Sequence, residues 1–363
     1  MRVLVLSDGE LNGEIRADRD VISSHLDPQR IQPTIISVSA PADSSELSLR
    51  AQFQFDPRAL LRLRRIVRES KIELLHGLGA RVGPLVSMAG RSTGVPTLIT
   101  IYRASIPENR LHEATARFRW RLALSGVDRI TVPSEGVGRS LAMLLGERER
   151  IYVIRPGLQV EEIDPIPSRE SLGLPEGAFI VTLAPPDLTP SQDLLDRCDL
   201  TLDAVRHLLK RHPEAHLMVL GEGAYLESLR KTAQHYRPAL PILWGGNRPN
   251  LAEIIASANV YVDFASMEMV SPGIILAAML GKPIVAPNIP SVAEVIEPNV
   301  AGLLVEPKNS AEFAAQINRL IQYDGLSHRL GRVAQRRTQE HYSIDAQSSA
   351  LVSFYETTIY TRR

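Results

Sequence analysis

Short apolar runs alternate with amphipathic stretches along the first half of the chain. The run RVLVLSD at residues 2–8 ends at polar residues, as a strand buried on both faces would. Residues 56–70 repeat apolar positions at helical spacing, with Asp56 as a candidate cap and Pro57 at the first helical position. This alternation predicts a parallel sheet covered by helices on both faces. We expect its other strands at residues 33–39, 72–77, 96–102, 129–134 and 151–157.

The second half repeats this pattern after an irregular segment. Residues 156–177 are rich in Pro, Glu and Ser without a long apolar period, and their start is interpreted as an interdomain linker. The sequence therefore predicts two doubly wound α/β domains, at residues 1–158 and 159–342, with a ligand cleft between them. A last helix, within 343–363, is expected to cross back to the first domain. The strands expected in the second half are 179–185, 215–223, 241–246, 260–266, 283–287 and 301–307.

Composition narrows the class of protein. A chain of 363 residues is long enough for about two domains, and its formal net charge of zero argues against a strongly basic nucleic-acid binder. The single cysteine, Cys198, excludes an internal disulfide framework and a cysteine-based metal cluster. No run approaches the roughly 18 apolar residues of a membrane span, and the N-terminus is too short and too quickly charged for a signal peptide. We therefore expect a cytoplasmic protein.

The loop within SMEMVSPGIILAAMLGKPIVAP, residues 266–287, is the first candidate site. Glu268 follows a predicted buried strand, and Ser271 and Gly273 open the helix after it. Backbone N–H groups at a helix start can hold a phosphate, and the carboxylate could hold hydroxyl groups. The alternative is that Glu268 is a solvated loop carboxylate.

Four stretches of the chain resemble the nucleotide-sugar-dependent glycosyltransferases of family 4, group 1 type. They are similar to the family's last N-domain strand with its exit, its Gly-acidic-Gly turn, the helix before the donor loop, and the donor loop itself. The stretches lie at residues 127–158, 212–233, 245–266 and 271–321.

The resemblance implies a GT-B fold, with two Rossmann-like domains facing a central cleft. It also implies transfer of a hexose, with retention, from a UDP- or GDP-linked sugar to a saccharide or lipid-linked acceptor in polysaccharide biosynthesis. Glu268 matches the family's glutamate over the sugar hydroxyls. Ser271 and Gly273 would hold the diphosphate, and Gly221 and Gly223 would border the base.

The chain departs from the family pattern at three places. Leu276 stands where a second glutamate holds the ribose. Prolines 185 and 186 occupy the neighbourhood of the diphosphate-binding Arg and Lys, which leaves Arg197 as the nearby cation. Tyr102, followed by Arg103, stands where the family has a histidine near the transferred sugar. In the N-terminal glycine loop, by contrast, Gly13 is where a phosphate could approach the backbone.

Two further polar features have alternative interpretations. His76 ends a predicted strand and is either a site residue or a hydrogen-bonded core histidine. Asp18 and Asp20 mimic an acidic metal motif, but on a helix their carboxylates diverge by about 200°, and we interpret them as a solvated face. No other cluster has metal-ligand spacing, so no required metal is predicted.

Two arginine-rich stretches suggest a contact with an anionic membrane. In the helix at 58–68, Arg58, Arg62 and Arg65 share one face. Residues 117–126 add three more arginines beside Trp120. Basic amphipathic helices can rest on anionic lipid, although a solvated helix face is the simpler interpretation.

Three classes of function are compatible with these residues. The first is an active, metal-independent hexosyltransferase with Glu268, His76 and Tyr102 as candidate catalytic residues. The second is a glycosyltransferase-like binding or scaffold protein that has lost catalysis, because the departures affect ribose, diphosphate and sugar contacts together. The third, a related enzyme such as a nucleotide-sugar epimerase, would need more acid and base groups than His76 and Glu268 supply.

Overall fold

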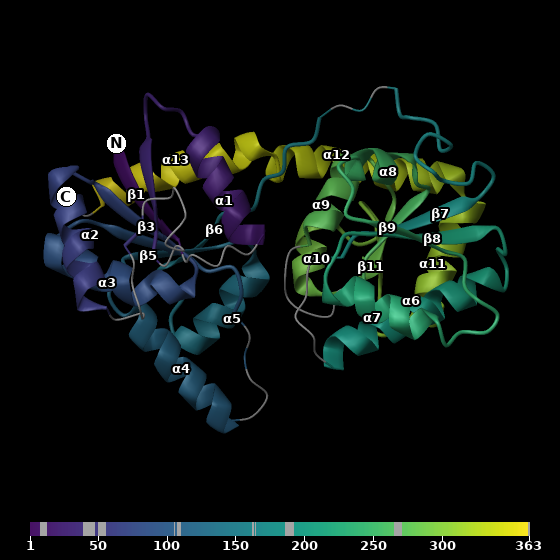
Figure 1. The fold of residues 1–363 in the computed structure, drawn as a ribbon, viewed down its shortest axis with the longest axis horizontal. Helices are drawn as coiled ribbons and strands as arrows, with labels where there is room; N and C mark the ends of the chain where they lie inside the picture. The colour runs from purple at the N-terminus through teal and green to yellow at the C-terminus, as the bar shows by residue number, and fades with distance from the viewer. Residues whose placement is uncertain are drawn as a thin grey trace. The chain divides into compact units, whose positions relative to one another are not determined.

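The chain folds into two compact units, shown in the computed structural model of Figure 1. Unit 1 comprises Met1–Gly157 and Ser343–Arg363, and unit 2 comprises Leu158–Tyr342. Each unit holds one six-stranded sheet in which all pairings are parallel. The structure describes residues 1–7, 13–38, 48–49, 56–104, 106, 110–161, 163, 165–185, 192–264 and 271–361.

Unit 1 has the strand order β2-β1-β3-β4-β5-β6. Its strands are β1 (Arg2–Ser7), β2 (Gln32–Ser37), β3 (Leu74–Leu78), β4 (Thr97–Thr100), β5 (Arg129–Val132) and β6 (Ile151–Val153). Its helices are α1 (Gly13–Ser24), α2 (Pro57–Glu69), η1 (Ala80–Val82), α3 (Gly83–Thr93), α4 (Arg110–Leu124), α5 (Glu135–Leu145) and α13 (Ile344–Tyr360).

Alternate residues of the strands face two separate cores in unit 1. In β1, Leu4 and Leu6 pack with α2, α3 and α5, whereas Val3 and Val5 pack with α1 and α13. The sheet is thus buried on both faces, which explains why its strands read as continuous apolar runs. Helix α13 lies beside α1 on one face, so the last residues of the chain complete a core begun by the first (Figure 1).

Unit 2 repeats the design with the order β12-β11-β10-β7-β8-β9. Its strands are β7 (Phe179–Leu183), β8 (Ala215–Leu220), β9 (Ile242–Gly246), β10 (Val260–Val262), β11 (Ile284–Pro287) and β12 (Leu303–Val305). Its helices are α6 (Gln192–Leu209), α7 (Ala224–Ala233), α8 (Leu251–Ser257), α9 (Pro272–Met279), α10 (Pro290–Val295), α11 (Ser310–Gln322) and α12 (Asp324–His341). Helices α6, α7 and α11 cover one face of the sheet, and α8, α9, α10 and α12 cover the other.

The strands expected from the sequence are confirmed, and each is shorter than the range predicted for it. The cap expected for α2 is also confirmed, since the Asp56 carboxylate accepts from the backbone N–H of Arg58 at 2.9 Å. Among the described helices, none is long and apolar enough to cross a bilayer.

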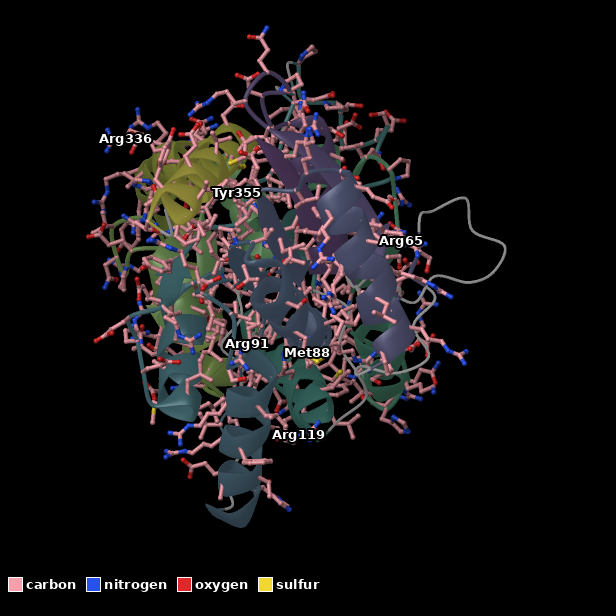
Figure 2. The ribbon with its side chains drawn as sticks, turned by 90° about the vertical axis from the view of Figure 1, so that its left-hand side faces the viewer. Arg65, Met88, Arg91, Arg119, Arg336 and Tyr355 are labelled. Carbon is pink, nitrogen blue, oxygen red and sulfur yellow. The ribbon has the colours of Figure 1, made fainter. Side chains whose placement is uncertain are left out.

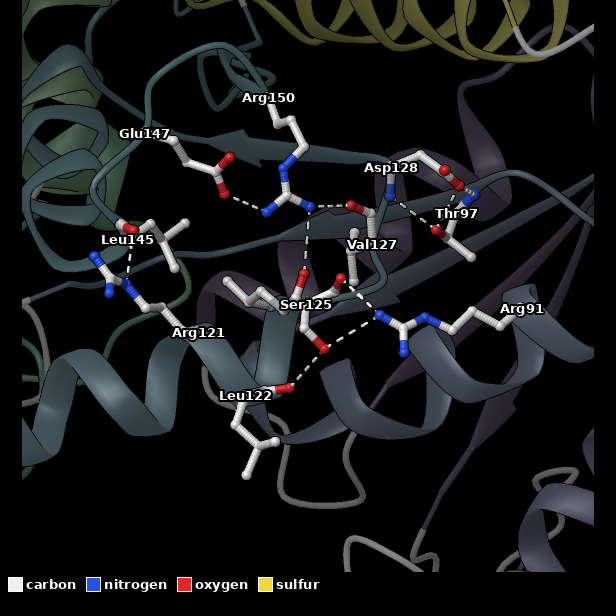
Figure 3. Close-up of polar contacts among 11 residues, drawn as sticks. Arg91, Thr97, Arg121, Leu122, Ser125, Val127, Asp128, Leu145, Glu147 and Arg150 are labelled. Carbon is white, nitrogen blue, oxygen red and sulfur yellow. Dashed lines mark hydrogen bonds and ion pairs between the residues drawn. The ribbon is translucent and has the colours of Figure 1, made fainter.

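Three arginines tie the helix ends of unit 1 together (Figure 3). Arg121 donates to the carbonyl of Leu145 at 2.9 Å, and Arg91 donates to that of Ser125 at 2.8 Å. Arg150 donates to the carbonyls of Leu124 and Val127 and pairs with Glu147. These bonds satisfy carbonyl groups where α4 and α5 end, which otherwise lack a partner within the helix.

Candidate functional site

The start of α9 packs directly against the carboxyl end of β7. A Cβ added to Gly273 would lie 2.1 Å from the Tyr261 hydroxyl oxygen and 2.6 Å from the carbonyl oxygen of Ala184. Only glycine therefore fits at this position. Pro272 occupies the first helical position, where its missing N–H costs nothing, and the next N–H groups belong to the helix start.

Ser271 precedes this helix as its N-cap residue and is buried. Its hydroxyl makes no hydrogen bond of good geometry to any described residue, although the Tyr261 hydroxyl is near. That tyrosine donates to the carbonyl of Ala184 at 3.1 Å. Burial, together with the charge of Asp263, raises the pKa of Tyr261 well above its usual value, so its hydroxyl stays protonated. The start of α9 thus offers a buried hydroxyl and helix-start N–H groups at one place.

Arg197 on α6 is buried rather than directed to solvent. Its Nε donates to the carbonyl of Phe264 at 2.8 Å, and its guanidinium lies 5.4 Å from the ring centre of Tyr225. The Tyr225 hydroxyl in turn bonds Thr201 at 2.7 Å. Arg197 therefore holds the chain at the exit of β10, where residues 265–270 begin.

Gly221 and Gly223 follow β8 with φ values of +97° and +96°, in the region that favours glycine. The N–H of Gly221 donates to the carbonyl of Gly246 at 2.8 Å, and Gly223 is the N-cap residue of α7. Because β10, β7 and β8 are neighbours, the five predicted residues Arg197, Gly221, Gly223, Ser271 and Gly273 lie near the carboxyl ends of three adjacent strands. Ligands of open α/β sheets bind at such an edge.

Glu268 and Leu276 are the remaining positions of the predicted donor loop. Glu268 lies outside the described residues. Leu276, at the position of the family's second glutamate, is half-buried and packs with the apolar core beneath α9.

His76 lies fully buried in the core of unit 1. Its Nδ1 bonds the Tyr355 hydroxyl at 2.7 Å and its Nε2 bonds the Thr100 hydroxyl at 2.8 Å. Burial lowers the pKa of His76 to about 3, so the ring is neutral at physiological pH. Of the two interpretations of this residue, these contacts favour the hydrogen-bonded core histidine.

Tyr102 lies just after β4 and is buried. Its hydroxyl donates to Oδ2 of Asp18 at 2.6 Å, and the same carboxylate accepts from Gln347 at 2.7 Å. The solvated-face interpretation of Asp18 was wrong, because these two donors hold its carboxylate inside unit 1. Asp20, two residues on, is exposed as expected. Gly13 is the first residue of α1, after the residues that the structure leaves undescribed.

Sequence reasoning missed Tyr261 and Gln347. Both sit in ordinary positions of a strand and a helix, and nothing local marks them as polar partners of distant segments. No group of three or more His, Cys, Asp or Glu side chains that could hold a metal occurs in the described part of the chain.

The two parallel six-stranded sheets, each covered by helices on both faces, define a GT-B fold. The crystal structure of Anabaena Alr3699/HepE in complex with UDP aligns with a TM-score of 0.80 at 16% identity. The alignment covers 98% of this chain and 100% of that one.

The glycosyl transferases group 1 model matches residues 196–337, and the glycosyl transferase 4-like domain model matches residues 3–157. The chain therefore belongs to the family 4, group 1 glycosyltransferases. Among curated relatives, a D-inositol 3-phosphate glycosyltransferase of Streptomyces bingchenggensis is 26% identical over 71% of this chain. The alignment covers only 59% of that protein's length.

A second curated relative is covered more fully. It is the GDP-mannose-dependent alpha-(1-6)-phosphatidylinositol monomannoside mannosyltransferase of Mycobacterium tuberculosis. It is 23% identical over 82% of this chain and 79% of its own length.

Proposed function

We propose that this protein transfers a hexose from a nucleoside-diphosphate sugar to a saccharide or lipid-linked acceptor, with retention at the anomeric carbon. The observation that carries the proposal is the start of α9, where Gly273 sits against Tyr261 and Ala184 so closely that only a glycine fits. Family membership and relatives whose names specify nucleotide-sugar donors support it.

The chemistry asked of this site is stabilisation of a leaving diphosphate. Helix-start N–H groups of α9 and the hydroxyl of Ser271 would donate hydrogen bonds to phosphate oxygens as negative charge develops there. Glu268 would accept from the sugar hydroxyls. Transfer of this kind depends on positioning the two substrates and on these donors more than on a strong protein base. We propose UDP or GDP as the nucleotide, with its base near Gly221 and Gly223, and no required metal.

Arg197 favours a second candidate function, a binding or scaffold protein without catalysis. A phosphate-binding arginine directs its guanidinium to the ligand, whereas the Nε of Arg197 is already bonded to the carbonyl of Phe264. If no other cation reaches the diphosphate, the leaving group lacks the charge-assisted contacts that make its departure fast.

A turnover assay separates the two candidates. The protein is incubated with UDP- and GDP-hexoses and a bacterial lipid extract, and release of nucleoside diphosphate and the labelled acceptor are both measured. The transferase hypothesis predicts acceptor-dependent release that falls in Glu268→Ala, with the α-anomeric configuration of the donor kept in the product. Donor binding without any turnover would support the scaffold hypothesis.

The outer surface of unit 1 supports a further part of the proposal, contact with an anionic membrane from the cytoplasmic side. Helix α2 carries five arginines and one glutamate. It buries Ala59, Leu63 and Val67, while Leu61 is 63% exposed among its arginines. Figure 2 shows Arg65 on α2 and Arg119 on α4, with α3 between them.

Helix α4 adds apolar side chains to this basic surface. Phe118 is 69% exposed and Leu122, one turn on along the same face, is 54% exposed, and Arg119 beside them is also exposed. Arginines that approach an anionic leaflet contribute about 1 kcal/mol each, and exposed apolar side chains can enter the interface. Arg121, by contrast, bonds the carbonyl of Leu145 and belongs to the fold.

Vesicle sedimentation tests this contact. Vesicles with anionic lipid should bind the protein at low salt, and Arg58→Ala with Arg65→Ala should weaken binding by about 2 kcal/mol, roughly 30-fold. The matched control is Arg336→Ala, an exposed arginine on α12. If charge reversal of Arg58 and Arg65 left binding to anionic vesicles unchanged, the membrane contact would be ruled out.

A further inference from the structure

Four segments of unit 1 meet at one polar group, which lies outside the proposed phosphate site of unit 2. Asp18 on α1 accepts from Tyr102, just after β4, at 2.6 Å and from Gln347 on α13 at 2.7 Å. The carbonyl oxygen of the Gln347 side chain accepts from the backbone N–H of Gly157 at 2.8 Å. We call these four residues the Asp18 network. Its members are separated by up to 329 positions in the sequence.

The bonds of the Asp18 network fix the orientation of the Gln347 side chain. The carboxyl oxygens of Asp18 accept from Tyr102 and Gln347, and the backbone N–H of Gly157 only donates. The amide of Gln347 must therefore turn its Nε2 to Asp18 and its Oε1 to Gly157. Burial raises the pKa of Tyr102 well above its usual value, so its hydroxyl remains the donor. Burial also raises the pKa of Asp18, and the hydrogen bonds from Tyr102 and Gln347 oppose that shift.

Gly157 gives the network its importance, because it is the last residue of unit 1 before the chain enters unit 2. A Cβ at Gly157 would lie 2.6 Å from the carbonyl oxygen of Ser343, the residue at which the chain returns. The first and last residues of unit 2 are also paired, since the N–H of Leu158 donates to the carbonyl of Tyr342 at 2.8 Å. The outgoing and returning segments are therefore side by side, and Gln347 bonds the first of them.

A second carboxylate links the same helix to the same loop segment. Glu14, one turn before Asp18 on α1, pairs with Arg103 at 3.2 Å. The two residues that follow one another after β4, Tyr102 and Arg103, are thus each held by α1. From α13, the titratable side chain of Tyr355 faces Asp18, and its hydroxyl is hydrogen-bonded to His76.

We propose that Asp18 and Gln347 are positioning residues, which fix the direction in which the chain leaves unit 1 and couple it to the segment bearing Tyr102 and Arg103. They act through these neighbours and not by touching substrate. Tyr102 stands where the family resemblance implies a contact to the transferred sugar, so the inference rests on the proposed function for its kinetic effect alone. Its structural effect, the spread of distances between the two units, does not depend on it.

Exchanging the carboxylate of Asp18 and the amide of Gln347 between the two positions tests the proposal. Gln347→Glu places two carboxylates against each other, and Asp18→Asn leaves at least one hydrogen-bond donor without an acceptor. The double variant Asp18→Asn with Gln347→Glu restores every pairing. Its new amide would accept from Tyr102 and donate to the new carboxylate, which would also accept from Gly157. The matched control is Asp20→Asn, the same change at an exposed position two residues along α1.

Two readouts are compared across these variants. Pairs of spin labels at Ser92→Cys in unit 1 and Gln339→Cys in unit 2 report the distribution of distances between the units; both positions are exposed, whereas Cys198 is buried. Turnover gives kcat and KM for donor and acceptor. A small misplacement of reacting groups can cost about a hundredfold in rate, so a fall of about tenfold in kcat with little change in donor KM is expected for each single variant.

The expected result is a broader distance distribution in both single variants and recovery of width and kcat in the double variant. The proposal would be overturned if the double variant had a kcat as low and a distance distribution as broad as the worse single variant. It would also be overturned if the distance distribution were the same in all variants. Loss of thermal stability without a change in the distance distribution would show a purely structural bond and would also overturn it. If the wild-type protein shows no turnover, the proposed function fails while the distance measurement still decides this inference.

Discussion

Replacing Gly273 by alanine should both destabilise unit 2 and weaken nucleotide binding. The new methyl group would meet the Tyr261 hydroxyl oxygen at 2.1 Å and the Ala184 carbonyl oxygen at 2.6 Å. Forcing a group into a packed site typically costs about 1–3 kcal/mol, and displacing Tyr261 also loses a hydrogen bond of about 1 kcal/mol. Alanine regains up to about 1 kcal/mol of helix propensity. The last two contributions roughly cancel, so the net expectation is a loss of about 1–3 kcal/mol in the unfolding free energy.

Gly325 offers a closely matched control for this substitution. It follows Asp324 in the first turn of α12 as Gly273 follows Pro272 in α9, but no atom lies within 4 Å of a Cβ added there. Gly325→Ala should therefore be neutral or slightly stabilising. Adding Tyr261→Phe to Gly273→Ala removes the atom at 2.1 Å and should recover part of the loss, because Ala184 remains in the way.

Urea unfolding measures these differences in unit 2 alone. The chain has two tryptophans, Trp120 in α4 and Trp244 in β9, so a Trp120→Phe background leaves fluorescence that reports unit 2. Nucleotide affinity is then measured under conditions where each variant is folded. The reasoning is refuted if Gly273→Ala is as stable as Gly325→Ala and binds nucleotide as tightly as the parent protein.

Two further predictions concern stability. Tyr355→Phe removes the hydroxyl bonded to His76 and should cost about 1–3 kcal/mol in urea unfolding, whereas Tyr360→Phe, 71% exposed, should cost nothing measurable. Burial lowers the pKa of Lys282 to about 8 from 10.5, so between these values the unfolded chain holds a proton that the folded chain has lost. The stability of the wild-type protein relative to Lys282→Met should therefore rise as pH rises from about 8 towards 10.5. A difference in unfolding free energy that is flat over this pH range would contradict the assignment.

The element pattern was predictable because it depends on local sequence. Runs such as residues 2–8 are apolar because both faces of each strand are buried, and the observed β1 ends one residue before the run does. The cap at Asp56 was likewise predictable, since its partner lies two residues away. The ends of the strands were harder to delimit, because the residue pattern does not mark where ladder pairing starts and stops. The predicted range of β4 is too long at both ends, and that of β3 starts two residues early and ends one residue early.

Side-chain partners were predictable only where the partner was near in sequence. Asp18 was misread because its two donors lie 84 and 329 positions away, and a helix pattern alone showed its carboxylate diverging from that of Asp20. His76 had two open interpretations for the same reason, because Tyr355 lies 279 positions on. For Arg197, the pattern identified the residue but not the direction of its side chain, which the carbonyl of Phe264 determines.

The central claim is that unit 2 binds a nucleoside-diphosphate sugar at the start of α9. The most direct test is thermal unfolding with UDP, GDP, ADP and their common sugar conjugates at millimolar concentration. A ligand at about 100 times its dissociation constant should stabilise the protein by about 2.7 kcal/mol. We predict a shift with UDP or GDP, a larger one with its sugar conjugate, and loss of that extra shift in Glu268→Ala. No shift with any of these nucleotides would contradict the claim.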